Sequence, residues 1–518
     1  MFGSSLGTAR AASKCEQKHI VEQNCPDCGL SSGEAVTGDS AQALDLMLPT
    51  LKSATEGFAT QFKNGAGVVN YFKAPDFSAS KPVTPLVIDI DPKERHQQMW
   101  GFGGAMTEAC MLNLKRLSPA SEDAFMHQVF DPNRGAGFNY LRVPLSANDF
   151  SSSDFSLDDT PGNQPDPDLR HFDFSRETEL IPYLLQAKKI NPELHLMATP
   201  WTAPAWMKKP PQLRGGDLNP AYYDAYARYL IRILEEFQRN GVQIDEMSVV
   251  NEPLIGWKEF GYYPQMDLDP AGMTVFLRDH FVPLLQKEQK AGKLHTQLLL
   301  HDHNWDNAQY VGAMLDDKTI RSVTGGVAFH CYNGTPSTMF SSMASHPDVP
   351  IFNTECTGQL KPFQGGADMQ WWLKNESLDV VRAGAVGAMG WNLCLDQNGG
   401  PRNFGGCRNC RGMVTIDQKQ NFTFNEEFDA IAQMSRYVRY GAVRIGSTDS
   451  SSQGVSNVAF QNPDGSFVLV MSNRTGAPVT LTVRNDDCET TQVSIPANGA
   501  VSLHWGKPDA NSSRNAPH

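Results

Sequence analysis

The sequence predicts an α/β fold, a (β/α)8 TIM barrel with a side β-sandwich domain formed by both ends of the chain. Three observations lead there. Eight short apolar segments alternate with helical patterns over residues 96–430. Short strands separated by Asn- and Gly-containing turns fill residues 442–505, and two more strand-like runs precede the first barrel segment. Alternating strands and helices close most compactly as a parallel barrel wrapped by helices.

The expected barrel strands are apolar runs that end in polar residues. They are 99–105, 139–145, 195–201, 246–252, 297–303, 326–332, 350–356 and 387–395, with helical patterns at 179–189, 221–237, 271–289 and 371–383. An open doubly wound sheet is the competing fold. It usually has fewer units and a Gly-rich phosphate turn after its first strand, which Gly101-Phe-Gly-Gly104 does not match.

The two ends of the chain have a different sequence pattern from the barrel region. After a last helix at 428–440, short strands are expected at 442–445, 458–461, 466–472, 479–483, 491–495 and 500–505, a spacing typical of an antiparallel sandwich. We therefore expect a weakly ordered tail or cap at 1–60 and N-terminal sandwich strands within 61–95. The barrel would occupy 96–430, the C-terminal sandwich 431–506, and a second tail 507–518.

The composition limits the classes of binding partner and the cellular locations that we expect for this chain. The 518 residues carry a formal charge of −13, which argues against nucleic acid and anionic membranes. No apolar run reaches the roughly 18 residues of a spanning helix. Residues 1–13 show no signal peptide, yet five Asn-x-Ser/Thr sequons are compatible with export. We expect an extracellular monomer that acts on a carbohydrate and needs no cofactor.

Nine of the ten cysteines fall into two settings. Cys15, Cys25, Cys28, Cys407 and Cys410 lie in loop-like sequence and could form disulfides, whereas Cys110, Cys331, Cys356 and Cys394 lie in apolar segments and are expected to be buried thiols. The pairs 25/28 and 407/410 could also make a four-thiolate zinc site. Local disulfides or free thiols are the favoured interpretation, because no zinc-ribbon context surrounds them.

Two glutamates stand at the ends of two expected strands. Met247-Ser-Val-Val-Asn-Glu-Pro253 and Val349-Pro-Ile-Phe-Asn-Thr-Glu355 are β-favouring runs that finish on a carboxylate. The fourth and seventh strands of a barrel face each other across its mouth, so Glu252 and Glu355 could form a pair. Carboxyls roughly 5–5.5 Å apart cleave a glycoside with retention, and roughly 6.5–9.5 Å with inversion. Arg142 could keep one of them ionised.

The other strand ends carry residues that suit sugars. Aromatic faces stack on pyranose rings, and carboxylates and amides bind hydroxyls. The candidates are Arg142, Asp149, Trp201, Trp206, Asn251, His301–Asn304, His330, Tyr332, Trp391 and Asn392. Trp201 and Trp391 could instead be core aromatics. His301 and His303 share a strand face, but without a third ligand they do not indicate a metal site.

As a set, these motifs resemble glycoside hydrolase family 30, the glucosylceramidase and endo-β-1,6-glucanase group. The similar segments run from about Trp100 to Trp505 and include 101–108, 141–150, 199–208, 250–253, 329–332, 352–356 and 390–401. The resemblance implies a retaining mechanism with Glu252 as acid/base and Glu355 as nucleophile. It also implies a −1 subsite lined by Asp149, Trp201, Asn251, His330, Tyr332 and Trp391.

The resemblance leaves the substrate open. The cysteine loop 405–412 looks like that of microbial members near the β-1,6-glucanases, while residues 1–45 match nothing in the family. The leading hypothesis is therefore a secreted endo-β-1,6-glucanase. A glucosylceramidase is the alternative, and a glycan-binding barrel without turnover is a remote one.

Overall fold

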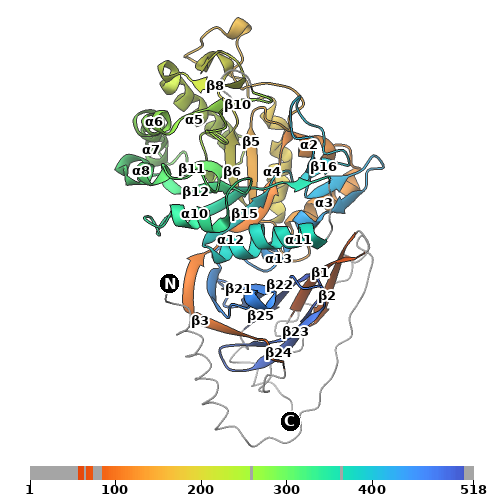
Figure 1. Cartoon of the computed structure of the whole chain (residues 1–518). Helices are drawn as coiled ribbons and strands as arrows, with labels where there is room; N and C mark the ends of the chain where they lie inside the picture. The colour runs from red at the N-terminus through yellow and green to blue at the C-terminus, as the bar shows by residue number, and fades with distance from the viewer. Residues whose placement is uncertain (1–55, 64–65, 74–83, 257–260, 362–365, 507–518) are drawn as a thin grey trace, which may run out of the picture. The chain divides into compact units, whose positions relative to one another are not determined.

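The computed structural model describes residues 56–63, 66–73, 84–256, 261–361 and 366–506 (Figure 1). The chain forms two compact units. One takes in Met1–Trp100, Gln364–Arg382 and Gln433–His518, and the other Gly101–Phe363 and Ala383–Ala432. The outer parts of both expected tails, residues 1–55 and 507–518, lie outside the described residues.

The second unit is built on a closed barrel of eight parallel strands, which confirms the predicted fold (Figure 1). Neighbours in the barrel are neighbours in sequence, so each strand end meets the next at one edge. The strands are β4 (Gly101–Ala105), β5 (Tyr140–Leu145), β6 (His195–Pro200), β9 (Glu246–Met247), β11 (Gln297–Asn304), β12 (Thr324–His330), β13 (Ile351–Glu355) and β15 (Ala385–Gly390).

Amphipathic helices connect these strands. In α5 (Tyr223–Arg239), for example, Tyr226, Leu230 and Phe237 are buried at helical spacing. The other helices of this unit are α2 (Glu108–Leu114), α3 (Pro119–Phe130), α4 (Ile181–Ile190), α6 (Pro270–Val275), α7 (Val282–Lys290), α8 (Val311–Asp316), α9 (Lys318–Arg321) and α10 (Pro336–Ser342). A π-helical turn, η6 (Phe276–Phe281), joins α6 to α7, so the helix predicted at 271–289 is confirmed.

The first unit contains a sheet of nine strands in the order β2-β1-β25-β22-β21-β20-β3-β23-β24. The strands are β1 (Glu56–Lys63), β2 (Ala66–Lys73), β3 (Val87–Gln98), β20 (Val443–Ser447), β21 (Val455–Gln461), β22 (Phe467–Asn473), β23 (Val479–Arg484), β24 (Thr490–Ile495) and β25 (Ala500–Trp505). β3 pairs with β20 along one part and with β23 along another, and both parts share one apolar core.

N-terminal and C-terminal strands thus share one domain, as predicted. β1 was not predicted: it begins at Glu56, inside the segment expected to be a weakly ordered cap, and pairs with β2 and β25. The same unit holds α11 (Gly366–Trp372), the π-helical η7 (Leu373–Leu378) and α12 (Asp379–Arg382). α13 (Glu426–Ser435) spans the boundary between the units in the sequence.

Small sheets organise the loops beyond the barrel strands. β7 (Lys208–Lys209), β8 (Arg214–Leu218) and β10 (Gln265–Asp267) form one, and β14 (Gly358–Gln359) pairs with β17 (Cys410–Arg411). A third contains β16 (Cys394–Asp396), β18 (Val414–Ile416) and β19 (Phe422–Phe424). The strand predicted at 387–395 is therefore two strands, β15 and β16. The left-handed backbone of Asn392, at φ 60°, separates them.

The fourth barrel strand is shorter than predicted. β9 ends at Met247, and residues 248–253 continue as irregular backbone rather than as the last residues of a strand. Asn251 N still donates to Pro200 O at 2.8 Å, and Glu252 N to Asp302 O at 3.0 Å. Glu252 has a φ of 47°. This left-handed conformation is costly for a residue with a Cβ and is typical of functional sites.

Candidate active site

Glu252 and Glu355 come together at the carboxyl ends of the barrel strands. One oxygen of each and a ring nitrogen of His330 all lie within 4.8 Å of one another. The side chains are nearly buried, with 11% of Glu252 and 7% of Glu355 exposed. Two carboxyls this close cannot both ionise without nearby positive charge, and the barrel supplies it from below.

The floor of the site is a buried charge network centred on Asp302 of β11. Asp302 Oδ2 accepts from Arg142 Nη2 at 2.9 Å and from Ser248 Oγ at 2.6 Å. Its Oδ1 accepts from Thr354 Oγ1 at 2.9 Å and lies 3.0 Å from His330 Nε2. Despite burial, Arg142 and His330 hold the pKa of Asp302 well below its usual range. Asp302 is therefore a fixed negative charge.

Arg142 connects this floor to the glutamate pair. Its Nη1 donates to Glu355 Oε2, and its Nη2 donates to Asn251 Oδ1 at 2.8 Å as well as to Asp302. The arginine side chain is fully buried. A buried cation requires compensating charge, and Asp302 and Glu355 provide it.

His330 lies between the two acidic centres. Its Nε2 faces Asp302, and its Nδ1 is 3.1 Å from Glu252 Oε1 and 4.0 Å from Glu355 Oε1. Burial opposes the charged ring, but the charge of Glu355 and the hydrogen bonds to Asp302 and Glu252 outweigh it and raise the pKa of His330 to about 9. The imidazolium donates at both nitrogens, which fits carboxylate oxygens on both sides.

Donors surround Glu355 on both oxygens. Oε2 accepts from Arg142, and Oε1 accepts from the Tyr332 hydroxyl at 2.8 Å. Burial raises the pKa of Glu355, with His330 and Arg142 acting in the opposite direction. For Glu252 the hydrogen bond and charge of His330 outweigh burial and lower the pKa. Oε2 of Glu252 accepts no hydrogen bond from the residues that the structure describes.

Aromatic residues and Asp149 form one wall. Trp201 and Trp391 stack with centroids 5.0 Å apart, and the Arg142 guanidinium lies 5.0 Å from the Trp201 centroid. Both indoles are almost fully buried in an apolar cluster with Phe150. Trp391 hydrogen-bonds Asp149, whose pKa is raised well above its usual value by burial and by the charges of Glu355 and Glu252. All nine residues predicted for the site are thus in one contact network.

Three residues that the structure places here were not among the final predicted site residues. Asp302 and His303 were named among the polar residues at the end of the fifth strand, but neither was given a role beside the glutamate pair. His303 Nδ1 lies 3.8 Å from Glu252 Oε1. Tyr263, in the loop beyond β9, packs on the apolar cluster, and the charges of Glu252, Asp149 and Glu355 help to raise its pKa. No strand end marks its position.

The chemistry of the site does not favour a metal ion. Glu252, His330 and Glu355 offer ligand atoms at suitable spacing. However, the raised pKa of His330 leaves its ring protonated and without a lone pair at neutral pH. Arg142 already neutralises Glu355. A divalent cation would therefore add positive charge beside two cations that are already present, Arg142 and protonated His330.

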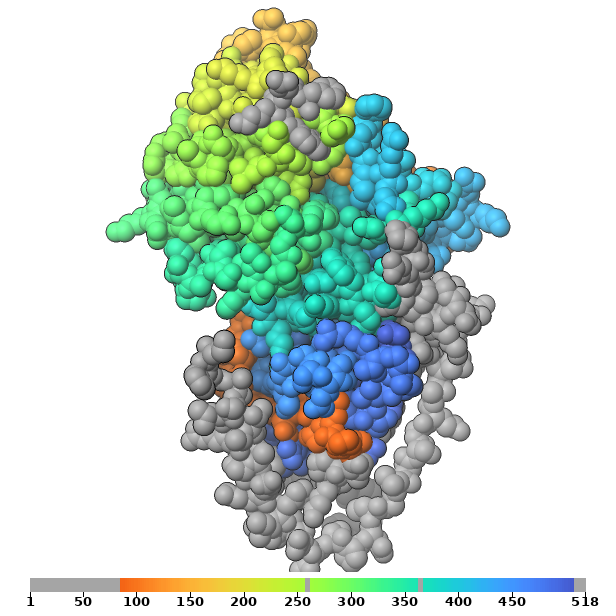
Figure 2. Space-filling view, in the orientation of Figure 1, coloured from red at the N-terminus to blue at the C-terminus, as the bar shows by residue number. Residues whose placement is uncertain are grey.

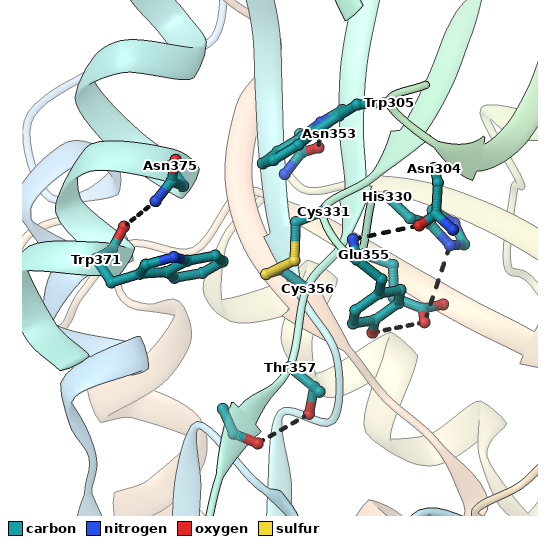
Figure 3. Close-up of a disulfide and its surroundings, with 12 residues drawn as sticks. Asn304, Trp305, His330, Cys331, Asn353, Glu355, Cys356, Thr357, Trp371 and Asn375 are labelled. Atoms are coloured by element: carbon teal, nitrogen blue, oxygen red, sulfur yellow. Dashed lines mark hydrogen bonds and ion pairs between the residues drawn. A yellow bond between two sulfur atoms is a disulfide. The ribbon is translucent and has the colours of Figure 1, made fainter. Parts of the chain in front are cut away.

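The cysteines require one correction. Cys331 and Cys356 form a disulfide instead of being buried thiols (Figure 3). They follow β12 and β13, neighbouring strands, so both sulfurs lie at one edge of the barrel beside His330 and Glu355. Cys110 and Cys394 are buried free thiols, as expected. Cys407 and Cys410 form a local disulfide, so they do not ligate zinc, and Cys25 and Cys28 lie outside the described residues.

A barrel with two facing carboxyls, a buried arginine and stacked tryptophans at its strand ends defines a TIM-barrel glycosidase. The chain belongs to glycosyl hydrolase family 30. The family's TIM-barrel domain matches residues 99–438, and its β-sandwich domain matches 441–503. The family resemblance is confirmed, and the chain is an enzyme that hydrolyses glycosidic bonds. In the part of the chain that the structure describes, every helix is too short or too polar to cross a bilayer.

Relatives named as endo-1,6-glucanases and relatives named as glucosylceramidases have similar sequence identity to this chain. Endo-1,6-beta-D-glucanase of Neurospora crassa is 29% identical over 448 residues, 82% of this chain and 88% of that protein. Lysosomal acid glucosylceramidase of Mus musculus is 27% identical over 450 residues, 82% and 85% of the two chains. A solved endo-beta1,6-glucanase superposes with a TM-score of 0.79 at 27% identity, covering 88% of this chain and 100% of that one.

Proposed function

We propose that the protein is a retaining β-glucosidic hydrolase in which Glu355 is the nucleophile and Glu252 the acid/base. The observation that carries this proposal is that one oxygen of each carboxyl lies within 4.8 Å of the other, close to the roughly 5–5.5 Å of retaining enzymes and short of the roughly 6.5–9.5 Å of inverting ones. The directions of the two pKa shifts, raised for Glu355 and lowered for Glu252, would by themselves favour the opposite roles.

Two features of the site support our assignment over those directions. Both oxygens of Glu355 face donors, Arg142 and Tyr332, so a proton there would have to displace a hydrogen bond. Oε2 of Glu252 can carry a proton while Oε1 still accepts from His330. Charge balance agrees: Arg142 and His330 then neutralise Asp302 and Glu355, and Glu252 is neutral.

The reaction follows in two displacements. Glu355 attacks the anomeric carbon as the glycosidic bond breaks, and Glu252 gives its proton to the leaving oxygen. The ester to Glu355 removes one negative charge beside Arg142. Glu252, now a carboxylate, takes a proton from water as the water oxygen attacks the anomeric carbon. Glu355 leaves as a carboxylate, and Glu252 is protonated again for the next cycle.

The substrate that we propose is β-1,6-linked glucan, cleaved internally. The similarity to a solved endo-beta1,6-glucanase extends over that whole chain, and the Cys407–Cys410 disulfide fixes the loop that looks like that of microbial members. Glucosylceramide is the second candidate, because the mouse glucosylceramidase aligns over a similar share of the chain.

Two assays test mechanism and substrate separately. A 2-fluoro-glucoside inactivator should label Glu355, as read by peptide mass spectrometry, and a label on another residue would contradict the roles. Purified protein should release oligosaccharides from pustulan. Ceramide release from glucosylceramide micelles without pustulan cleavage would contradict the glucanase proposal. Failure to hydrolyse any aryl β-glucoside, with measurable glycan binding, would favour the glycan-binding alternative.

We also propose that the enzyme is secreted and acts as a monomer. Two disulfides in the catalytic unit support an oxidising compartment. Sedimentation of the purified protein and recovery of activity from culture medium test the two statements.

A further inference from the structure

A pair of exposed aromatic rings lies beside the catalytic mouth, on two loops that meet. Phe404, beyond β16, is 76% exposed, and Tyr262, before β10, is 62% exposed. Large apolar rings on a surface are ordinary when scattered singly, whereas neighbouring rings at a cleft indicate binding. In the space-filling view, the blue segment near residue 400 lies beside the yellow-green part of the catalytic unit, and Arg214 of that part hydrogen-bonds Phe404 O (Figure 2).

The two loops are held by one arginine. Arg214 Nη1 donates to Tyr262 O at 2.9 Å and to Phe404 O at 3.2 Å. Its Nε and Nη2 make a paired contact with Asp154 at 2.6 and 3.0 Å. The guanidinium also lies 5.6 Å from the centroid of the Phe404 ring. Five donors used in one plane fix both backbones, so the exposed rings are presented in a set position.

The same loop is continuous with the catalytic site. Asn403 N donates to Asp149 O at 2.8 Å, and Asn403 Oδ1 accepts from Arg214 at 2.8 Å. Gly405 lies so close to Tyr262, and Gly406 to Asp149, that a side chain at either position would collide with backbone. The loop that carries Phe404 therefore adjoins Asp149, the residue that the resemblance places in the −1 subsite. Moving this loop away would break these close backbone contacts.

We propose that Phe404 and Tyr262 form an aglycone-side subsite that stacks on a glucosyl unit of the glucan chain. This proposal rests on the proposed glucanase activity. A pyranose offers an apolar face of C–H groups to an aromatic ring, and the Asp154 carboxylate, 30% exposed and bound to the same arginine, can accept from its hydroxyls. Rings held rigidly before binding lose little entropy when the sugar stacks, so they contribute to selectivity for a polymer.

The test compares two substrates that share the −1 sugar. β-Glucosyl fluoride has a one-atom leaving group and reports only the chemistry, whereas pustulan also occupies the aglycone side. We expect Phe404→Ala to lower kcat/KM for pustulan about tenfold and to leave kcat/KM for the fluoride within about twofold. Tyr262→Ala should act in the same direction. Arg214→Gln should reproduce the effect without removing a ring.

A matched control is Phe340→Ala, which removes another exposed ring, on α10, and should change neither rate. Unchanged pustulan cleavage by Phe404→Ala, or an equal loss on both substrates, would overturn the subsite. A loss confined to glucosylceramide would assign the rings to a lipid instead. Wild-type protein that hydrolyses the fluoride but not pustulan would contradict the glucanase proposal. It would also contradict the proposal that a glucan unit binds at Phe404 and Tyr262.

Discussion

The floor and the rim of the catalytic mouth are built in opposite ways. On the floor, Arg142, Asp302 and His330 are fully buried, and the arginine and the histidine each make a charged hydrogen bond to Asp302. On the rim, Phe404 and Tyr262 are mostly exposed, and Arg214 holds the backbone carbonyl of each. Buried charges tolerate little change, while exposed rings can be exchanged without unfolding the protein. In our proposal, bond cleavage on the floor and substrate choice on the rim are thereby separated in the fold.

This separation accounts for the comparisons. A glucanase and a glucosylceramidase have almost the same identity to this chain. The barrel carries the hydrolysis of a glycosidic bond, whereas the loops beyond its strands meet whatever is attached to the sugar. Similarity across the whole chain therefore establishes the family, and in our proposal the rim selects the substrate.

The largest expected effect lies in the glutamate pair. Glu355→Gln should lower kcat by more than about 10⁴-fold, because the amide cannot form the ester. Glu252→Gln should lower it less on an activated aryl glucoside, and azide should restore turnover by attacking the intermediate in place of water. Stopped assays with and without azide measure both effects. If azide instead restored the activity of Glu355→Gln and gave a glucosyl azide of retained configuration, Glu355 would be the acid/base and Glu252 the nucleophile.

The next effect concerns the stability of the floor. Asp302→Ala leaves Arg142 and His330 without their shared partner and should reduce the free energy of unfolding by about 3–5 kcal/mol. Asp168→Ala is the control, because its pair with Arg170 is exposed and should change the free energy by less than about 0.5 kcal/mol. Urea unfolding curves compare the two variants. Equal unfolding midpoints would contradict the claim that the buried charges of the floor contribute more to stability than an exposed ion pair.

The pH dependence of stability follows from His330. Its pKa rises from an ordinary 6.5 to about 9 in the folded protein. The folded state gains from protonation, so this contribution is complete below about pH 6.5 and disappears as pH rises through 9. The loss is at most about 3 kcal/mol. Urea unfolding at pH 6, 7.5 and 9 should show the decline, and His330→Gln should flatten it. The same slope in both proteins would contradict a charged His330.

The smallest effect should come from Tyr332, which spans floor and rim. Its ring is 42% exposed, and its hydroxyl donates to Glu355. Tyr332→Phe removes a hydrogen bond to a charged group, so kcat/KM should fall about tenfold, while the melting temperature stays within about 2 °C. Tyr183→Phe is the matched control, since that hydroxyl bonds Glu122 away from the glutamate pair. A large drop in stability for Tyr332→Phe would mean that it belongs to the floor.

Much of this floor was predictable from sequence, because strand ends are marked by apolar runs that stop at polar residues. The positions of Glu355 and Arg142 follow from such runs together with the geometry of a closed barrel. The irregular backbone of residues 248–253 was not predictable: its β-favouring residues read as a strand, and only packing against β6 and β11 forces Glu252 into a left-handed conformation.

The rim was less accessible to sequence reasoning. Tyr263 and Phe404 lie in loops without periodicity, and the Arg214 contacts that join those loops connect residues up to 190 positions apart. The Cys331–Cys356 disulfide is an intermediate case. Each cysteine lies at the end of a predicted strand, and consecutive barrel strands are neighbours, so the pairing was available from topology although burial alone suggested free thiols.

That disulfide has a consequence for how the chain acquires activity. Cys331 separates His330 from Tyr332 in sequence, and Cys356 follows Glu355, so one covalent cross-link joins the segments that carry Glu355, His330 and Tyr332 (Figure 3). A chain synthesised in a reducing cytosol would keep all of its glutamates and lose the clamp. Recombinant production in such a host would then yield soluble but poorly ordered catalyst, and oxidative refolding would be the step that switches the enzyme on.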